Sequence, residues 1–394
     1  MNVQYFKQEI KEELDNILRY WIIYAPDEIN GGFVGRIDNE NKVHDEAPKG
    51  SVLNARILWT FSAAYNATAK PEYLKMADKA YRYIMEFFID KEYDGVYWSV
   101  DFKGVPLDTK KQVYAIAFVL YACCEYYKSN KNEAIKTTAI RLYQIIQQYS
   151  FDEVKGGYFE AFSRNWQPLE DLRLSDKDAN EKKTMNTHLH ILEAYTNLYR
   201  IWPSQELANH QRELVNDFLS YIISPETGHL DLFFDENWKV KGNIISYGHD
   251  IEASWLLLEA AEVLKDEDLI SRCKVAAVTL ANSAVKGLDT DGGLWYEYEP
   301  SEHLLVKQKH WWPQAEAMVG FLNAYQVSKD EKYLQNAFHS WQFIKQFILN
   351  KKNGEWFWGV NGDYSIMKGE DKVGIWKCPY HNSRACLEII KRLE

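Results

Sequence analysis

Hydrophobic side chains recur along the chain at the spacing expected of helices that bury one face. Residues 6–23 bring Phe6, Ile10 and Leu14 to one side of a helix, and residues 70–89 follow the same spacing. A second set of segments is apolar around more of its circumference, which is typical of helices enclosed by other elements. These enclosed helices are predicted near residues 50–66, 110–127, 184–200, 247–264, 309–327 and 380–393.

A glycine followed by alternating aromatic and aliphatic residues occurs six times between the helical segments. The alternation predicts short strands or hairpins. Successive copies are 61 to 71 residues apart, and such a period indicates one supersecondary unit repeated along the chain. The copies contain Gly32, Gly95, Gly157, Gly228, Gly293 and Gly354.

Six repeats of two helices predict an all-α fold, an (α/α)6 barrel of six helical hairpins with short β-hairpins at one mouth. An open solenoid is the alternative, but it needs polar caps at both ends. The segment from Phe6 to Trp21 is too apolar to be such a cap. Because the chain also has no linker rich in Pro, Gly or Ser, we predict a single catalytic domain over residues 1–394.

Composition narrows the class of partner. The chain is 46% hydrophobic and 15% aromatic, which is enough for a large core, and its 14 Trp and 26 Tyr also suit stacking against sugars. A net charge of −11 argues against a nucleic-acid partner. Five Cys without a CxxC spacing indicate neither a disulfide framework nor a zinc knuckle. Lacking a signal core and a membrane-spanning run, the protein is expected to be cytoplasmic, and its acidic surface favours a monomer.

The first turns of the enclosed helices carry the candidate chemistry. In a closed ring these turns converge at one mouth, just after the glycine segments. Asn186 and His190 share a helix face because they are four residues apart, and His249 and Glu252 do so at a spacing of three. The polar and aromatic residues gathered there are Arg56, Tyr114, Asn186, His190, His249, Glu252, Trp311, Trp312, Gln314, Glu316, His381 and Arg384.

Three histidines, His190, His249 and His381, fall at matching places on three of these helices. His188 lies two residues from His190 and points about 200° away on a helix, so the two cannot share a metal. Three convergent imidazoles could still ligate zinc, although no HExxH-like set is present. Nucleotide-binding glycine loops are absent as well.

Histidines without a metal offer a different chemistry. An imidazole with a pKa near 6.5 can act as base or acid at neutral pH. Two of them on opposite faces of a substrate can remove a proton from one side of a carbon and return one to the other, which inverts that centre. The carbon must be acidified by an adjacent carbonyl, as carbon 2 of an open-chain aldose is. An arginine or a neutral imidazole can hold the enediolate oxygen that develops.

Four separated motifs resemble the N-acylglucosamine 2-epimerase superfamily, from about residue 30 to the C-terminus. The last of them narrows the resemblance towards the cellobiose 2-epimerases of that superfamily. The motifs are Asn186-Thr187-His188-Leu189-His190, His249-Asp250-Ile251-Glu252-Ala253-Ser254-Trp255, His310-Trp311-Trp312-Pro313-Gln314-Ala315-Glu316 and Trp376-Lys377-Cys378-Pro379-Tyr380-His381-Asn382.

This resemblance implies an (α/α)6 barrel that reversibly epimerises carbon 2 of the reducing-end glucose in β-1,4-linked disaccharides. Cellobiose and lactose would be substrates, lactose giving epilactose, with no metal and no nucleotide cofactor. His249 and His381 match the acid/base pair, and His190 matches the third histidine, which polarises the carbonyl and enediolate oxygens. The positions that match substrate-binding or histidine-orienting residues are Arg56, Tyr114, Asn186, Glu252, Trp312 and Trp376.

Three other functions remain open on the sequence. An aldose–ketose isomerase of the same superfamily would use the same enediolate and return the proton to carbon 1. A glycoside hydrolase would need two carboxylates across the scissile bond, for which Asp250 with Glu252, or Asp289 with Asp291, are candidates. A non-catalytic sugar-binding protein would need the aromatic residues but not the histidines.

Overall fold

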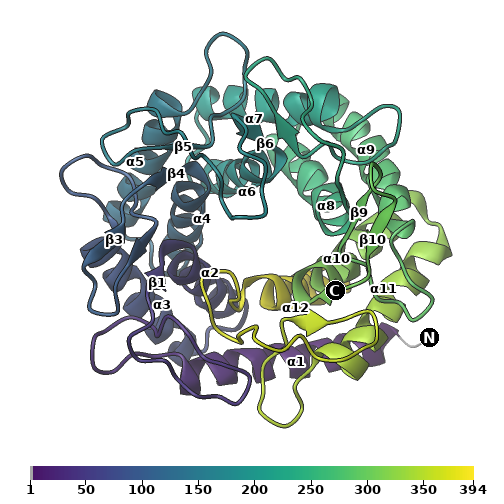
Figure 1. Cartoon of the computed structure of the whole chain (residues 1–394), viewed down its shortest axis with the longest axis horizontal. Coiled ribbons are helices and arrows are strands. Elements are labelled where there is room, and N and C mark those ends of the chain that lie inside the picture. Colours follow the sequence, from purple (N-terminus) through teal and green to yellow (C-terminus); the bar gives the residue numbers. More distant parts are fainter. Residues whose placement is uncertain (1–2) are drawn as a thin grey trace.

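The computed structural model describes residues 3–394, in which twelve α-helices form two concentric rings (Figure 1). The inner ring consists of α2 (Ser51–Thr68), α4 (Val113–Asn130), α6 (Met185–Ile201), α8 (Tyr247–Leu264), α10 (Trp311–Ser328) and α12 (Tyr380–Arg392). The outer ring consists of α1 (Val3–Tyr24), α3 (Pro71–Tyr83), α5 (Glu133–Tyr149), α7 (Gln205–Asp217), α9 (Glu267–Val285) and α11 (Glu331–Phe343). Three outer helices continue into π-helical turns, η1 (Ile84–Phe88), η2 (Phe218–Ile222) and η3 (Ile344–Ile348). The predicted (α/α)6 barrel is confirmed.

The two ends of the chain close the ring. Inner helices α2, α4, α6, α8 and α10 each pack on the outer helix that follows them, whereas α12 packs on α1 (Figure 1). The sixth pair therefore joins the first helix to the last, instead of forming a hairpin as the repeat count suggested. Two indole N–H groups link α1 to the last glycine segment, which precedes α12. Trp21 of α1 donates to Glu355 at 2.6 Å, and Trp356 donates to Glu13 of α1 at 2.8 Å.

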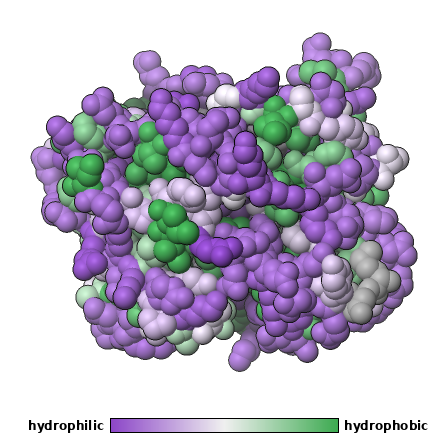
Figure 2. Space-filling view, turned by 90° about the horizontal axis from the view of Figure 1, so that it is seen from below, coloured by the Kyte–Doolittle hydropathy of each residue, from purple (hydrophilic) through white to green (hydrophobic). Residues whose placement is uncertain are grey.

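The outer helices bury the face that the sequence pattern predicts. Phe6, Ile10 and Leu14 of α1 are buried, and so are Tyr73 and Ala77 of α3. Their opposite faces supply the polar wall of the molecule, on which hydrophobic residues form small separate patches in the side view of Figure 2. No helix within residues 3–394 is long and apolar enough to cross a membrane.

Short antiparallel strand pairs link consecutive repeats around the mouth where the inner helices begin. The glycine segments themselves form single β-bridges, such as Pro26 with Phe33, and the strands lie a few residues further on. The sequence therefore placed most of these strands a few residues too early in the chain. The strands are β1 (Lys49–Gly50), β2 (Ser99–Val100), β3 (Pro106–Asp108), β4 (Lys111–Gln112), β5 (Ala161–Phe162), β6 (Lys183–Thr184), β7 (Phe233–Phe234), β8 (Ile245–Ser246), β9 (Glu297–Glu299), β10 (Leu304–Val306), β11 (Lys309–His310) and β12 (Gly359–Val360).

A buried lysine lies two residues before four of the inner helices and three residues before α12, and it pairs with a carboxylate from the preceding glycine segment. The pairs are Lys49 with Asp27 (2.7 Å), Lys111 with Asp90 (2.8 Å), Lys183 with Asp152 (2.8 Å), Lys309 with Asp289 (2.7 Å) and Lys377 with Glu355 (2.8 Å). Before α8 the equivalent positions are Ile245 and Ser224. The two charges are lost together there, as expected because one buried charge without its partner is costly.

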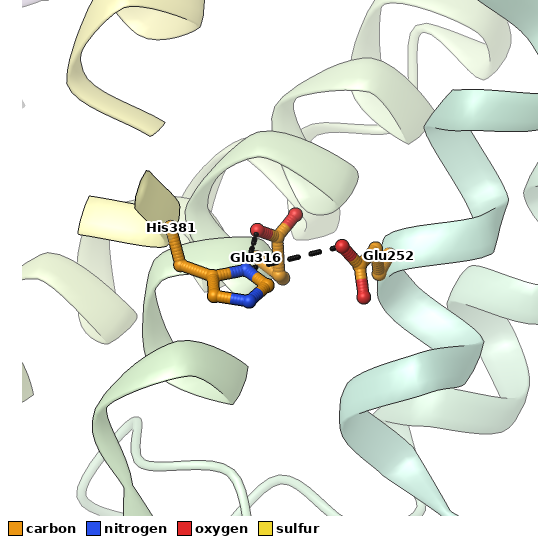
Figure 3. A group of neighbouring side chains, drawn as sticks. All are labelled: Glu252, Glu316 and His381. Carbon is orange, nitrogen blue, oxygen red and sulfur yellow. Dashed lines mark hydrogen bonds and ion pairs between the residues drawn. The ribbon is translucent and has the colours of Figure 1, made fainter. Parts of the chain in front are cut away.

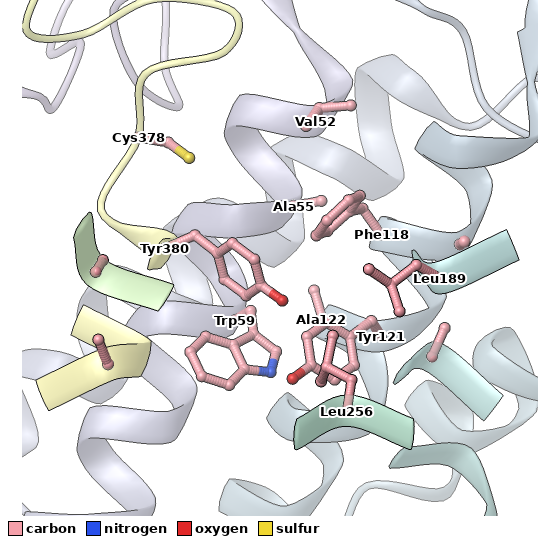
Figure 4. Packing of buried hydrophobic residues seen from close by; sticks show 14 of the residues in the cluster. Val52, Ala55, Trp59, Phe118, Tyr121, Ala122, Leu189, Leu256, Cys378 and Tyr380 are labelled. Carbon is pink, nitrogen blue, oxygen red and sulfur yellow. The ribbon is translucent and has the colours of Figure 1, made fainter. Parts of the chain in front are cut away.

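Aromatic and aliphatic side chains fill the middle of the inner ring (Figure 4). Trp59 packs against Tyr121 at 5.4 Å between ring centroids and against Tyr380 at 5.1 Å. Phe118 meets the other side of the Tyr380 ring at 5.4 Å. This aromatic plug, with Leu256 beside it, separates the mouth where the inner helices begin from the opposite end of the barrel.

Candidate active site

A cavity of about 440 Å³ opens at the mouth where the inner helices begin. The barrel places the first turns of these helices around it, so side chains far apart in the sequence converge there. All nine residues predicted for the site line this cavity: Arg56, Tyr114, Asn186, His190, His249, Glu252, Trp312, Trp376 and His381.

His381 is held by a carboxylate on the neighbouring helix (Figure 3). Its Nδ1 lies 2.8 Å from Oε1 of Glu316, to which Arg384 also donates at 2.7 Å. Burial alone would raise the pKa of Glu316, but Arg384 and His381 outweigh it and lower that pKa to about 2. An ionised Glu316 accepts a hydrogen bond from Nδ1–H of His381. The Nε2 lone pair of His381 is then free to take a proton in the cavity.

Glu252 shares Arg384 with Glu316 but has the opposite charge preference. Its Oε1 accepts from Arg384 at 2.5 Å and lies 3.9 Å from Nδ1 of His381. Burial and the negative charge of Glu316 raise the pKa of Glu252 to about 8. One guanidinium neutralises one carboxylate, so Glu316 keeps the charge and Glu252 keeps a proton at neutral pH.

Glu252, Glu316 and His381 are the one group in residues 3–394 whose ligand atoms lie close enough together for a metal ion. Arg384 already donates to Oε1 of both carboxylates, so a guanidinium supplies the positive charge at that point. The imidazoles of His190, His249 and His381 do not form such a group in the described chain. The zinc alternative raised by the sequence therefore lacks its ligand geometry.

His249 lies in the first turn of α8, beside the ring of Trp312. The two rings are 4.7 Å apart, and Trp312 is also 5.7 Å from the ring of His381. Gly248 permits this approach, because a Cβ on it would come within 2.6 Å of the Trp312 ring. Nδ1 of His249 is 2.8 Å from the hydroxyl of Ser246, the N-cap residue of α8.

Burial keeps both of these histidines neutral. Desolvation lowers the pKa of His249 to about 3, with a further contribution from the nearby His190. Desolvation also lowers the pKa of His381 to about 3, although its hydrogen bond to Glu316 opposes the change. Both imidazoles can therefore accept a proton at neutral pH, and of the two only His381 has a carboxylate within hydrogen-bond distance to stabilise the imidazolium that results.

His190 packs between aromatic rings and binds a buried glutamate. Its ring lies 4.9 Å from Tyr114 and 4.7 Å from Phe118, and its Nδ1 is 2.6 Å from Oε1 of Glu193. Burial, then Arg56 and Arg384, hold the pKa of His190 well below its usual value. Burial raises the pKa of Glu193 to about 7. A protonated Glu193 donates to Nδ1 and leaves Nε2–H as a donor to a substrate oxygen.

Arg56 reaches the cavity across an aromatic face. Its guanidinium lies 4.2 Å from the Phe118 ring and donates to the Tyr114 hydroxyl at 2.7 Å. Several buried polar atoms near the cavity have no hydrogen-bond partner among the described residues, although such atoms are normally paired. They are Nε of Arg56, Oδ1 of Asn186, and Nε1 of Trp311 and Trp358.

The neighbouring histidine, His188, points away from the cavity. Its Nδ1 is 2.6 Å from the Thr184 carbonyl oxygen, and its Nε2 accepts from the Tyr158 amide at 2.9 Å. Both nitrogens are thus used in the core, as expected for a helix in which positions two apart face opposite sides.

The carboxylates that a hydrolase would need are used elsewhere, apart from Glu252. Asp250 accepts from the Leu230 amide and pairs with His229, outside the cavity lining. Asp289 and Asp291 both bind Lys309, at 2.7 and 2.6 Å. Neither candidate pair spans the cavity.

Sequence reasoning left several lining or supporting residues out of the predicted site. Glu193 lies three residues after His190, the same spacing as His249 and Glu252, so that signal was available. The segment from β5 to β6 had no periodic pattern, yet residues 172–179 line the cavity. Other residues not included in the predicted site are Glu160, Tyr296, Glu297, Trp358 and Tyr380.

Comparison with known proteins places this geometry in a family. The family model described as N-acylglucosamine 2-epimerase (GlcNAc 2-epimerase) matches residues 31–385. A cellobiose 2-epimerase of Bacteroides fragilis is 47% identical, with 98% of each chain covered. The structure of a cellobiose 2-epimerase from Bacillus thermoamylovorans is 40% identical and superposes with a TM-score of 0.95, covering 99% of this chain and 100% of that one. A D-mannose isomerase structure shares the fold, with a TM-score of 0.84 at 20% identity, covering 98% of this chain and 97% of that one.

Proposed function

The chain belongs to the N-acylglucosamine 2-epimerase family of carbohydrate epimerases, and we propose that it epimerises carbon 2 of the reducing-end glucose in β-1,4-linked disaccharides. Cellobiose would become glucosyl-mannose, and lactose would become epilactose. The relatives with the highest identity named above are cellobiose 2-epimerases, which supports this choice of substrate over a monosaccharide.

The pairing of His249 and His381 beside one tryptophan is the observation that carries the proposal. Both imidazoles pack near Trp312, His381 is buried and His249 is partly buried, and each has a hydrogen-bond partner at Nδ1. A sugar lying on the Trp312 ring would be close to both neutral imidazoles. A two-base inversion needs such a pair, and a hydrolase does not.

The proposed reaction starts with His381 assisting the opening of the reducing ring. His249 or His381 takes the carbon-2 proton, and electrons move to the carbonyl oxygen to form the cis-enediolate. Nε2–H of His190 and the Arg56 guanidinium hold the enediolate oxygens. The carbon 2–carbon 3 bond rotates, and the other histidine returns a proton to the opposite face.

The remaining cavity residues position the sugar or the histidines. Trp312 and Trp376 offer aromatic faces, while Asn186 and Tyr114 offer polar groups for hydroxyls. Glu252 accepts from Arg384 and holds its guanidinium in place, and the guanidinium in turn stabilises the ionised form of Glu316. None of these roles calls for a metal or nucleotide cofactor. A single catalytic domain, a monomeric state and a cytoplasmic location stay predictions of the sequence.

Product analysis tests the substrate and the reaction class. Purified protein is incubated separately with cellobiose, lactose and mannose, and the products are identified by proton NMR of their anomeric signals. Glucosyl-mannose from cellobiose and epilactose from lactose are expected. Free glucose would indicate a hydrolase, and ketose signals an isomerase. If only mannose reacts, the protein has another activity of the family, with a monosaccharide as its substrate.

A further inference from the structure

A second cavity, of about 780 Å³, lies at the opposite end of the barrel from the catalytic one. It is lined by the C-terminal halves of α2, α4, α6 and α8, by α12 from Arg384 onwards and by the middle of α1. Trp59 and Tyr121 of the aromatic plug (Figure 4) line this cavity, whereas Arg56 and Tyr114, earlier on the same two helices, line the catalytic one, so the plug lies between the two cavities. Neither the family relationship nor the proposed reaction assigns a role to this end of the barrel.

Aromatic side chains form the inner end of this far-end cavity. Trp59, Tyr121 and Trp255 line it, and the first two rings stack at 5.4 Å with 20° between their planes. Tyr121 is only 7% exposed, and its hydroxyl makes no hydrogen bond to the residues that the structure describes. The hydroxyl is not among the buried unpaired atoms, so it is open to the cavity and available to a ligand.

A preorganised set of polar groups stands beside these rings. Glu125 accepts from Asn66 at 2.7 Å, from Lys128 at 2.7 Å and from Asn197 at 3.1 Å. A carboxylate and amides held beside aromatic faces can accept from and donate to the hydroxyls of a sugar while the rings contact its apolar face.

The charges of the lining favour a neutral ligand over an anion. The lining carries both cationic and anionic side chains, and several of them are paired with one another. Arg200 binds Glu259 at 2.8 Å, and Lys70 binds Asp15 at 3.0 Å. A site for a phosphate or carboxylate would instead present unpaired cations. The volume is in the range that holds small organic ligands, about 300–1,000 Å³.

Two residues of this lining also touch the catalytic carboxylates. Trp255 donates from Nε1 to Oε2 of Glu316 at 3.1 Å, and Arg384 donates to both Glu252 and Glu316. Glu316 in turn holds His381. A molecule resting on Trp255 and Arg384 would therefore contact the groups that orient a proposed catalytic histidine.

We propose that the far-end cavity binds a neutral sugar of mono- or disaccharide size, and that the bound sugar alters turnover through Trp255 and Arg384. The binding claim goes beyond the proposed function, because it requires no epimerisation. The coupling follows from the shared hydrogen bonds, since a ligand that shifts Arg384 must change its contacts with Glu316.

Equilibrium dialysis with radiolabelled cellobiose tests the binding claim. The protein carries His249→Ala, so that the sugar is not converted while bound molecules are counted. Asn66→Trp narrows the mouth of the far-end cavity at an exposed position, and Ala63→Phe fills its wall. Asn209→Trp, on the exposed side of α7 and outside both linings, is the matched control.

Two cellobiose molecules per chain are expected for the His249→Ala protein and for its Asn209→Trp form. One per chain is expected with Asn66→Trp and with Ala63→Phe. Thermal unfolding at the wild-type temperature shows that the exposed Asn66→Trp variant is folded. One molecule per chain in every protein, or two in both blocked variants, would overturn the proposal.

Turnover measured without the His249→Ala change tests the coupling. At saturating cellobiose, kcat of Asn66→Trp is expected to differ from that of Asn209→Trp by about fivefold or more, a typical size for coupling between sites. Equal kcat values in the two variants would overturn the coupling. Failure of the proposed function is distinguishable, because a protein that binds two sugars without epimerising either still gives the expected dialysis counts.

Discussion

Replacing Glu316 with glutamine should remove most of the activity while leaving the fold intact. Glu316 is the ionised partner of His381, at 2.8 Å between Nδ1 and Oε1. When His381 takes a proton, its imidazolium and this carboxylate become an ion pair with charge centres about 4 Å apart. Such a pair is stabilised by about 4 kcal/mol at an effective dielectric constant near 20. At about 1.4 kcal/mol per tenfold in rate, Glu316→Gln should lower kcat by about 10³-fold.

The hydrogen bonds around Glu316 point the same way. Arg384 donates to one oxygen and Trp255 to the other. A glutamine amide must turn its NH2 group towards one of these donors, which leaves a buried polar group unpaired. The histidine is then held less well, in addition to losing the charge of its partner.

Glu252→Gln is the control for this prediction. Because Glu252 has its pKa raised to about 8, it already holds a proton at neutral pH, and glutamine resembles that neutral form. Its loss of kcat should therefore be much smaller than that of Glu316→Gln. The assay is the initial rate with saturating cellobiose, with thermal unfolding to check each fold. A folded Glu316→Gln protein within tenfold of wild-type kcat would refute the reasoning, as would a larger loss in Glu252→Gln.

Three further predictions concern the histidines, Glu193 and Glu13. His249→Ala and His381→Ala should each abolish turnover without lowering the unfolding temperature by more than a few degrees, and near wild-type activity in either variant would contradict the acid/base assignment. Glu193→Gln should keep most of kcat, because its amide can still donate to Nδ1 of His190. Glu193→Leu should lose most of kcat, because leucine cannot donate. Equal rates in the two variants would argue against a role for Glu193 in fixing the tautomer of His190. Burial raises the pKa of Glu13 from 4.5 to about 7. The unfolded chain therefore releases this proton at lower pH than the folded one, so wild-type stability falls as pH rises through that window. Glu13→Gln keeps an acceptor for Trp356, and its stability does not fall in this pH window. At pH 8 the variant should be more stable than the wild type by up to about 3 kcal/mol, at about 1.4 kcal/mol per pKa unit. Urea unfolding at pH 5 and pH 8 measures this, and an equal difference at both pH values would count against it.

Helices and cavity residues could be predicted because each has a local signal. Apolar periodicity marked α1 and α3, and the glycine repeat gave the number of units. Histidines in the first turns of α6, α8 and α12 converge as the ring requires. Once the barrel is closed, position along the helix decides which side chains reach the mouth.

Other features depend on contacts between distant segments, which no local pattern reports. The sixth helix pair joins α1 to α12 because the chain ends meet only after the ring has closed. The strands fell after the glycine segments since their hydrogen-bond partners lie in the next repeat. The lysine that precedes most inner helices has no local sign of burial in the sequence, because its carboxylate partner, Asp27 or a counterpart, lies about 20 to 30 residues earlier in the chain. Glu193 has a local signal in its spacing from His190, but its bonds to Tyr380 and Arg384 join it to residues nearly two hundred positions away in the sequence.

Deuterium incorporation at carbon 2 tests the central claim most directly. Cellobiose is incubated with the wild-type protein in heavy water, with and without EDTA, and followed by proton NMR. Removal of the carbon-2 proton by one histidine and its return by another predicts a mannose-type anomeric signal with deuterium at carbon 2, at the same rate in both samples. Epimer formed without deuterium, or a reaction that stops in EDTA, would contradict metal-free proton transfer by His249 and His381.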